Sequence, residues 1–252
     1  NNTGWGLYLT GIGTTTTTFQ NNQITNNGNG LYLNNIHNIN ITNTLQDNGG
    51  TGCHIVSCKN IIIQDINFTN TTRPYNNAIL IDNAGYAGSD NITLKNLEIN
   101  SPSSHAIYIG QYPTLTTNLH FENITINNCA NIAITKHGEA SIENFYMNQI
   151  TINNPIGNGI HLTDGPYGYH ITNIQMNQMN INGAKSDAIY ISMTRQESSH
   201  DVTLTNSTIN GTTGNGATIQ ARGTIIIQNN NNTFTNNTGW GLYLTGIGTT
   251  TT

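Results

Sequence analysis

Three pairs of side chains in this sequence have the residue types needed for acid–base chemistry. They are His137 with Glu139, Asp164 with His170, and Arg195 with Glu197. A general base acts only within hydrogen-bond reach of the proton that it takes, so each pair depends on how its segment is folded. All three lie in stretches of variable length that follow a short apolar run, and loops on a rigid scaffold are where function usually sits.

A second set of residues forms a regular series. Short stretches of the form small, apolar, any, apolar, such as GLYL, AIYI and GIHL, recur along the chain. Neighbouring side chains on a strand face opposite sides, so the residue between the two apolar ones should point outward. This outward position is filled by Tyr8, Tyr32, His54, Tyr108, His161, Tyr190 and Tyr243, with Leu80, Ala133 and Thr218 in the other three copies.

The stripe of tyrosine and histidine has three open explanations. Aromatic rings fit an exposed parallel sheet and stack on one another without any further role. They could also pack against the stripe of a neighbouring molecule, or lie against sugar rings, because tyrosine offers apolar area and a polar tip at low entropy cost.

The elements that present these residues follow from an internal repeat. Between the short stretches runs a longer pattern, Asn, apolar, any, apolar, any, Asn-like, two of any kind, apolar, as in NITLKNLEI and NLHFENITI. The short stretches recur in steps of 22 to 29 residues. Alternating apolar positions in runs too short for helices, bounded by Gly and Asn, predict β-strands. Units of this size that cannot bury their own apolar face predict a stacked solenoid of about nine coils.

The Asn-like position of the pattern predicts a structural ladder. In stacked parallel strands, amide side chains can hydrogen-bond to the equivalent group above and below, and Asn tolerates a left-handed turn. The predicted ladder consists of Asn21, Asn43, Asp65, Asn96, Asn123, Gln149, Gln178, Asn206 and Asn229.

This pattern resembles the parallel β-helix repeat proteins of the pectin-lyase-like superfamily, and the resemblance covers essentially the whole chain. It implies an all-β, right-handed parallel β-helix over residues 1–252 as a single domain. The function that it implies is open, because the superfamily includes polysaccharide lyases and hydrolases, tailspikes, adhesins and surface-layer proteins. Hydrolases of polygalacturonate in this superfamily carry Asn-Thr-Asp, Asp-Asp, Gly-His-Gly and Arg-Ile-Lys motifs, none of which occurs here.

Composition excludes several classes of function. A net charge of −5 and seven Lys and Arg residues do not form the basic surface that nucleic acid requires. No run of about 18 apolar residues could span a membrane. Cys53, Cys58 and Cys129 are too few for a disulfide framework, and Cys53 in an apolar position indicates a buried thiol.

No metal site or cofactor is specified by the sequence. Asp82, Asp90 and Asp164 are too dispersed to indicate the clustered calcium ligands of the lyases. A calcium ion between loops stays open, because single Asp and backbone oxygen ligands leave no reliable spacing.

Residues 236–252 repeat residues 1–17 letter for letter, as NNTGWGLYLTGIGTTTT. We therefore expect a block of 235 residues to recur, with residues 236–252 beginning the next copy. Identical blocks stacked end to end would cover the open edges of the solenoid.

These features favour a non-catalytic structural unit of an extracellular filament, sheath or surface layer, with identical copies as partners end to end and laterally. The alternative is a polysaccharide-acting enzyme, or a glycan-binding adhesin or tailspike-like module. The extracellular expectation rests on Asn-x-Ser/Thr acceptor sites for glycans, among them Asn40, Asn67, Asn91, Asn123 and Asn206.

Overall fold

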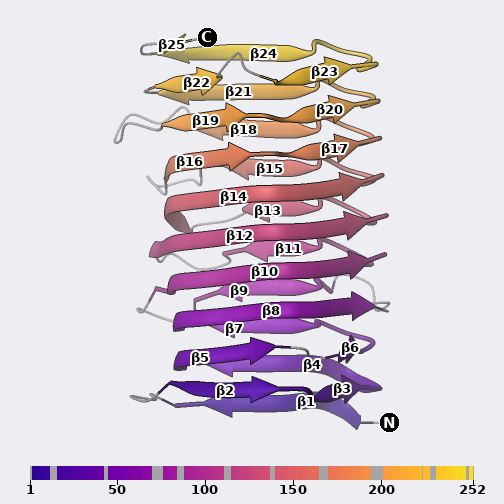
Figure 1. Ribbon diagram of the computed structural model, residues 1–252, viewed down its shortest axis with the longest axis vertical. Coiled ribbons are helices and arrows are strands. Elements are labelled where there is room, and N and C mark those ends of the chain that lie inside the picture. Colours follow the sequence, from indigo (N-terminus) through magenta and orange to yellow (C-terminus); the bar gives the residue numbers. More distant parts are fainter. Residues whose placement is uncertain are drawn as a thin grey trace.

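The computed structural model is a solenoid of stacked parallel β-strands (Figure 1). The structure describes residues 2–11, 16–42, 45–69, 76–83, 88–110, 115–136, 140–164, 170–193, 201–222, 224–227, 231–247 and 250–251. Within these residues every strand pairing is parallel and no helix occurs, so none could cross a membrane. The predicted all-β parallel solenoid is confirmed.

One face of the solenoid is a ten-stranded sheet. In spatial order its strands are β1 (Asn2–Thr10), β4 (Asn27–Asn34), β7 (Cys53–Val56), β9 (Ile79–Asp82), β11 (Ile107–Ile109), β13 (Ile134–Lys136), β15 (Ile160–Thr163), β18 (Ile189–Met193), β21 (Ala217–Arg222) and β24 (Leu242–Ile247). This sheet consists of the short repeated stretches that carry the stripe.

The longer pattern forms a fifteen-stranded sheet on the opposite side. Its main path is β2 (Thr17–Gln20), β5 (His37–Thr42), β8 (Lys59–Thr69), β10 (Asp90–Asn100), β12 (Leu115–Asn127), β14 (Ser141–Asn153), β16 (Ile171–Asn177), β19 (Val202–Thr205), β22 (Ile225–Ile227) and β25 (Thr250–Thr251). Beside it pair β3 (Gln23–Thr25), β6 (Leu45–Asp47), β17 (Asn180–Asn182), β20 (Thr208–Asn210) and β23 (Thr233–Thr235).

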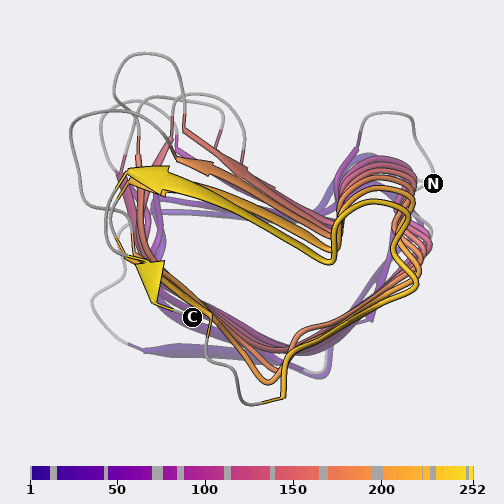
Figure 2. The ribbon, with the colours of Figure 1, turned by 90° about the horizontal axis from the view of Figure 1, so that it is seen from above.

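Seen along the long axis, the two sheets enclose a continuous core (Figure 2). Its columns repeat one inward position from coil to coil. One column in the ten-stranded sheet runs through Leu31, Cys53, Ile79, Ile107, Ile134, Ile160 and Ile189, all fully buried. Because each coil covers the apolar side chains of the next, burial is shared along the whole axis.

Asparagine ladders bend the strands of the larger sheet. Asp65, Asn96 and Asn123 have positive φ angles of 57°, 52° and 50°. The Asn96 amide donates to Asp65 at 2.8 Å, and the Asn123 amide donates to Asn96 at 2.9 Å. The predicted ladder therefore occurs in these coils, in the left-handed conformation that Asn adopts more readily than most residues.

The ladder shifts by one residue where glutamine occupies the bend. Gln149 and Gln178 keep the positive φ, at 57° and 54°. In these coils the hydrogen bonds use the residues before the glutamines. Asn177 donates to Asn148 at 2.8 Å, and the next ladder member, Asn206, donates to Asn177 at 2.8 Å. Asn21 has the same φ of 56°, and predicted members Asn43 and Asn229 lie outside the described residues.

A second ladder, not predicted from the sequence, occupies the first Asn of the pattern. The amide donates to the coil before it at 2.8 Å from Asn60 to Asn38, 2.9 Å from Asn91 to Asn60, 3.0 Å from Asn144 to Asn118 and 2.9 Å from Asn173 to Asn144. Every member has a positive φ between 49° and 60°. The same physical reason, a left-handed residue with an amide, accounts for both ladders.

Candidate functional site

The aromatic stripe lies in one column on the outer side of the ten-stranded sheet. Strand register places Tyr8 beside Tyr32, Tyr32 beside His54, and His161 beside Tyr190. Leu80, Tyr108, Thr135, Thr218 and Tyr243 continue the same column. All seven predicted aromatic residues therefore share one column along the axis.

One position of the stripe differs from the prediction. Thr135, not Ala133, pairs with Tyr108 and His161, and Ala133 is fully buried. The segment Ala-Ile-Thr-Lys aligns with Ala-Ile-Tyr-Ile of the preceding coil, so Lys136 occupies an inward apolar position. Because lysine occupies this apolar position, the pattern of apolar residues in the sequence predicts the wrong register for this coil.

At its first coils the column forms an aromatic platform, which we define as Trp5, Tyr8, Tyr32 and His54. The rings of Tyr8 and Tyr32 stack with centroids 4.7 Å apart and planes at 11°. His54 meets Tyr32 edge-on at 5.1 Å, and Trp5 lies 5.0 Å from Tyr32. Trp5 is not part of the sequence pattern of the stripe, because it precedes the strand motif and pairs with Asn29 instead of a stripe residue.

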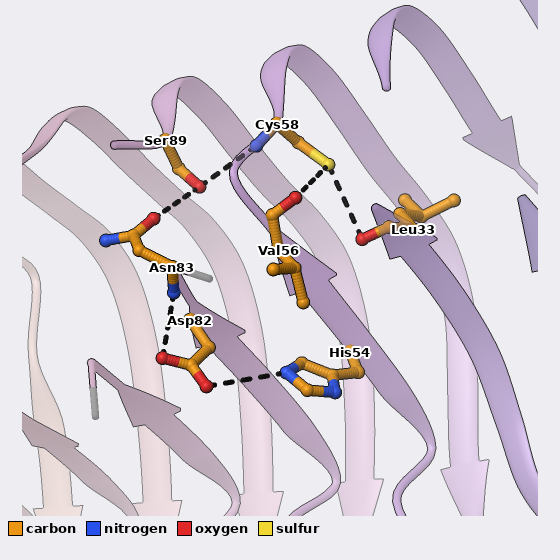
Figure 3. Close-up of polar contacts among 7 residues, drawn as sticks. All are labelled: Leu33, His54, Val56, Cys58, Asp82, Asn83 and Ser89. Atoms are coloured by element: carbon orange, nitrogen blue, oxygen red, sulfur yellow. Dashed lines mark hydrogen bonds and ion pairs between the residues drawn. The ribbon is translucent and has the colours of Figure 1, made fainter. Parts of the chain in front are cut away.

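A buried carboxylate lies beside this platform. Asp82, at the end of β9, is 5% exposed, and its Oδ2 lies 3.7 Å from Nε2 of His54 (Figure 3). The backbone N–H of Asn83 donates to Asp82 Oδ1 at 2.8 Å. A carboxylate on this face therefore approaches the imidazole from the neighbouring coil.

Buried polar groups hold this carboxylate in position. Asn83 is 1% exposed, and its Oδ1 accepts from the Ser89 hydroxyl at 3.1 Å while its Nδ2 donates to Thr116 at 3.1 Å. Ser89 in turn accepts from the backbone N–H of Cys58 at 3.2 Å (Figure 3). Satisfied buried polar networks of this kind rigidify the groups that they connect.

Two tyrosines near Asp82, Tyr32 and Tyr108, have raised pKa values. Burial raises the pKa of Tyr32, and the neighbouring Tyr8 and Asp82 raise it further. Burial also raises the pKa of Tyr108, again with a contribution from Asp82. Both phenols therefore keep their protons at neutral pH and remain hydrogen-bond donors.

Farther along the axis the column is interrupted. His161 and Tyr190 meet edge-on at 5.1 Å. Thr218 is 5% exposed and donates to Asp187 at 2.7 Å, while Tyr243 in the last strand is 42% exposed. The stripe thus contains the platform, Tyr108 with its ring centroid 5.4 Å from that of His105, the pair of His161 and Tyr190, and a terminal tyrosine, not one unbroken surface.

The acid–base pairs are only partly described. His137, Glu139, Arg195 and Glu197 lie outside the described residues. His170 Nε2 lies 3.7 Å from Glu143 Oε1 in the larger sheet. Asp164 lies near the buried Lys136. Burial lowers the pKa of Lys136, and the negative charge of Asp164 partly opposes this change. The Nζ of Lys136 donates to the carbonyl of Thr163 at 2.9 Å.

Asp82, Asp90 and Asp164, the three aspartates considered as calcium ligands, lie on different parts of the described structure. Asp90 belongs to the larger sheet, where it accepts from Thr117 and Asn118, and these hydrogen bonds help lower its pKa. Within the described residues, no group of three or more His, Cys, Asp or Glu side chains could hold a metal ion.

A shallow hollow of about 310 Å³ lies on the fifteen-stranded sheet. Its lining residues are Asp65, Ile66, Asn67, Asn96, Leu97, Glu98, Asn123 and Thr125. Asn67 and Asn100 donate to Glu98 at 3.4 and 3.0 Å, and Asn96 donates to Asp65. These polar groups bond to each other, and the bond from Asn96 to Asp65 belongs to the ladder.

The predicted glycan acceptor sites all lie on strands of the larger sheet or at their bends. Asn91, Asn123 and Asn206 are exposed, and each donates its amide to the preceding coil. Asn40 and Asn67 are partly buried. The three cysteines are fully buried and free of disulfides, and burial raises the pKa of each thiol.

Comparison with known proteins agrees with this architecture. The model of the right-handed beta-helix region matches residues 5–176, and the chain belongs to that family. A comparison with curated proteins finds no match.

Two solved structures have similar folds. The catalytic unit of the GH87 alpha-1,3-glucanase from Streptomyces thermodiastaticus strain HF3-3 aligns with a TM-score of 0.55 and 14% identity, over 89% of this chain and 49% of that one. The receptor binding domain of the Siphovirus 9NA tailspike aligns with a TM-score of 0.44 and 12% identity, over 88% and 51%. The chain thus spans about half the length of each, and at this identity the glucanase likeness shows the fold alone.

Proposed function

We propose that the chain is an extracellular polysaccharide-binding solenoid whose ligand lies along the outer side of the ten-stranded sheet. The observation that carries the proposal is the aromatic platform on a rigid sheet, with Tyr8 54% exposed and stacked on Tyr32. Flat rings with polar tips suit sugar rings, which present both apolar faces and hydroxyl groups. The similar fold of a solved alpha-1,3-glucanase catalytic unit supports the proposal by analogy of fold alone.

The proposal is for binding and not for hydrolysis. The carboxylates Asp82 and Asp164 are separated by three strand spacings, about 14 Å along the axis. Paired-carboxylate hydrolases place their two carboxyl groups about 5–10 Å apart. These two residues therefore do not form such a pair.

The test is Tyr32→Ala, with binding to soluble α-1,3-glucan oligosaccharides measured by calorimetry. Loss of one stacking ring costs about 1–2 kcal/mol, which weakens binding roughly 5- to 30-fold. The matched control is Tyr146→Ala, which removes a tyrosine stacked on His120 at 4.8 Å in the other sheet. Equal affinities for the wild type and Tyr32→Ala, across a panel of glycans, would refute the proposal.

A second candidate function is the filament unit, and one observation favours it. Leu242 and Leu244 of β24 pair with β21 and flank the outward Tyr243, as Leu7 and Leu9 flank Tyr8 in β1. A following copy of β4 would therefore find residues 242–244 of β24 in the arrangement that residues 7–9 of β1 present to β4. Electron microscopy of the native material distinguishes the two, because a filament shows an unbroken axial repeat of one block.

A further inference from the structure

We infer that the polysaccharide bound on this face is neutral and not acidic. The inference rests on the proposed function and narrows it to a class of ligand. It follows from the negative charge of Asp82 beside the aromatic platform and from the hydrogen bonds that fix this carboxylate in place.

The charge beside the aromatic platform is negative. Asp82 lies within 3.7 Å of His54, a member of the platform. Among the described outward positions of the ten-stranded sheet the one Lys or Arg is Arg222, at the end of β21. Six strand spacings separate β21 from β7, about 29 Å, which exceeds the screening length of about 8 Å at physiological salt.

The other nearby cation does not face the ligand. Lys136 occupies an inward position and is fully buried, with its ammonium group bonded to the carbonyl of Thr163. An acidic polysaccharide would therefore meet Asp82 without a described cation to pair with its own carboxylates. Recognition of carboxylates in proteins generally uses arginine or lysine.

Asp82 cannot turn away from a ligand at low cost. Its Oδ1 accepts from the N–H of Asn83, and the Asn83 side chain is fixed by Ser89 and Thr116. All three of these residues are at most 1% exposed. Burial is the main reason why the pKa values of Tyr32 and Tyr108 are raised, and the negative charge of Asp82 adds to the effect at both phenols.

A neutral sugar chain meets none of these costs. Its apolar ring faces can contact the stacked rings of Tyr8 and Tyr32 from the outer side of the sheet, and its hydroxyl groups can pair with the protonated phenols and with the imidazole of His54. Successive platform positions are about 4.8 Å apart, close to the length of one pyranose unit. A linear chain along the axis can thus place about one sugar on each coil.

The experiment compares a neutral and an acidic ligand of equal length. Binding of a linear glucan hexasaccharide and of a galacturonate hexasaccharide is measured by calorimetry at low salt, for the wild type, Tyr32→Ala and Asp82→Asn. We expect the wild type to bind the glucan at least about 10-fold more tightly than the uronate. The Asp82→Asn variant should reduce this ratio severalfold, since it removes the charge but keeps an oxygen for the N–H of Asn83.

Two further measurements isolate the charge effect. Glu122→Gln removes one negative charge from the other sheet, where Glu122 pairs with Lys95 at 3.0 Å, and should leave the ratio unchanged. For the wild type alone, raising the salt concentration should narrow the ratio because it screens Asp82. The salt dependence of the wild type tests the inference even if Asp82→Asn does not fold.

The outcomes separate the inference from the proposed function. Equal or tighter binding of the uronate, weakened by Tyr32→Ala, would overturn the inference and leave polysaccharide binding intact. A glucan preference that neither salt nor Asp82→Asn changes would also overturn it, because the preference would then not be electrostatic. If neither oligosaccharide binds, both proposals are wrong.

Discussion

At the scale of single residues, Lys136 is the least conventional member of the core. It fills a position that Ile109 and Leu162 fill in the adjacent coils, and it is fully buried. Burial lowers its pKa from 10.5 to about 8, and the nearby Asp164 opposes this change. The lowering corresponds to about 3 kcal/mol, which is the order of the cost of keeping the ammonium group charged in the core at neutral pH.

We expect Lys136→Met to stabilise the protein at pH 7 by about 1–3 kcal/mol, because replacing a buried charge with an apolar side chain of similar length is often favourable. In the wild type, between pH of about 8 and 10.5, the folded state has lost the proton that the unfolded state retains. Stability should therefore rise with pH across this window, and the variant should lack the rise.

Urea unfolding at a series of pH values measures both effects. Lys185→Met is the control, since Lys185 is exposed and its replacement should change stability by less than about 0.5 kcal/mol. A Lys136→Met profile parallel to that of the wild type would show that Lys136 titrates normally.

At the scale of elements, the ladders set where each strand bends. Asn144 at φ 60° donates to Asn118 at 3.0 Å and accepts from Asn173 at 2.9 Å. Two contributions coincide there, the tolerance of Asn for a left-handed backbone and the hydrogen bonds between coils. They can be separated because glycine keeps the first and loses the second.

We expect Asn144→Gly to lower the free energy of unfolding by about 1–2 kcal/mol, through loss of the ladder bonds. Asn144→Ala should lower it by about 1–2 kcal/mol more, because alanine is strained at positive φ. Thermal and urea unfolding of both variants provide the comparison. Equal effects of Gly and Ala would mean that backbone strain at the bend is unimportant.

At the scale of the whole molecule, stability is shared between neighbouring coils. One core runs between the two sheets, and the strands inside each sheet path pair with the coil before and the coil after them. In such a solenoid a further coil adds its own interface without altering the others. The repeat of residues 1–17 at 236–252 therefore permits a second block to continue the same ladders.

We expect a chain of two consecutive 235-residue blocks to form one straight rod. Nine strand spacings between β1 and β24 rise about 43 Å, so two blocks should measure about 86 Å. Negative-stain electron microscopy gives the length, and the single block is the control. Two particles joined at a variable angle would show that the blocks do not stack.

The sequence by itself determined the coil. Its apolar alternation specified which side chains enter the core, and Asn at fixed positions specified the left-handed bends, because both are properties of a short segment and its immediate neighbours. The stripe from Tyr8 to Tyr243 followed from the same alternation. Only at Thr135 did Lys136, an unexpected residue in an apolar position, conceal the register.

The tertiary structure decided what depends on the coil above or below. Identical letters take two conformations: residues 2–5 lie in β1 and pair with residues 27–29, whereas residues 238–240 hydrogen-bond to residues 212–215 outside any strand. Trp5 joins the platform while Trp240 is 69% exposed. The contact of Asp82 with His54 and the shift of the ladder to Asn148 arise in the same way. Each needs a partner more than twenty residues distant, and loops of variable length set which side chains meet.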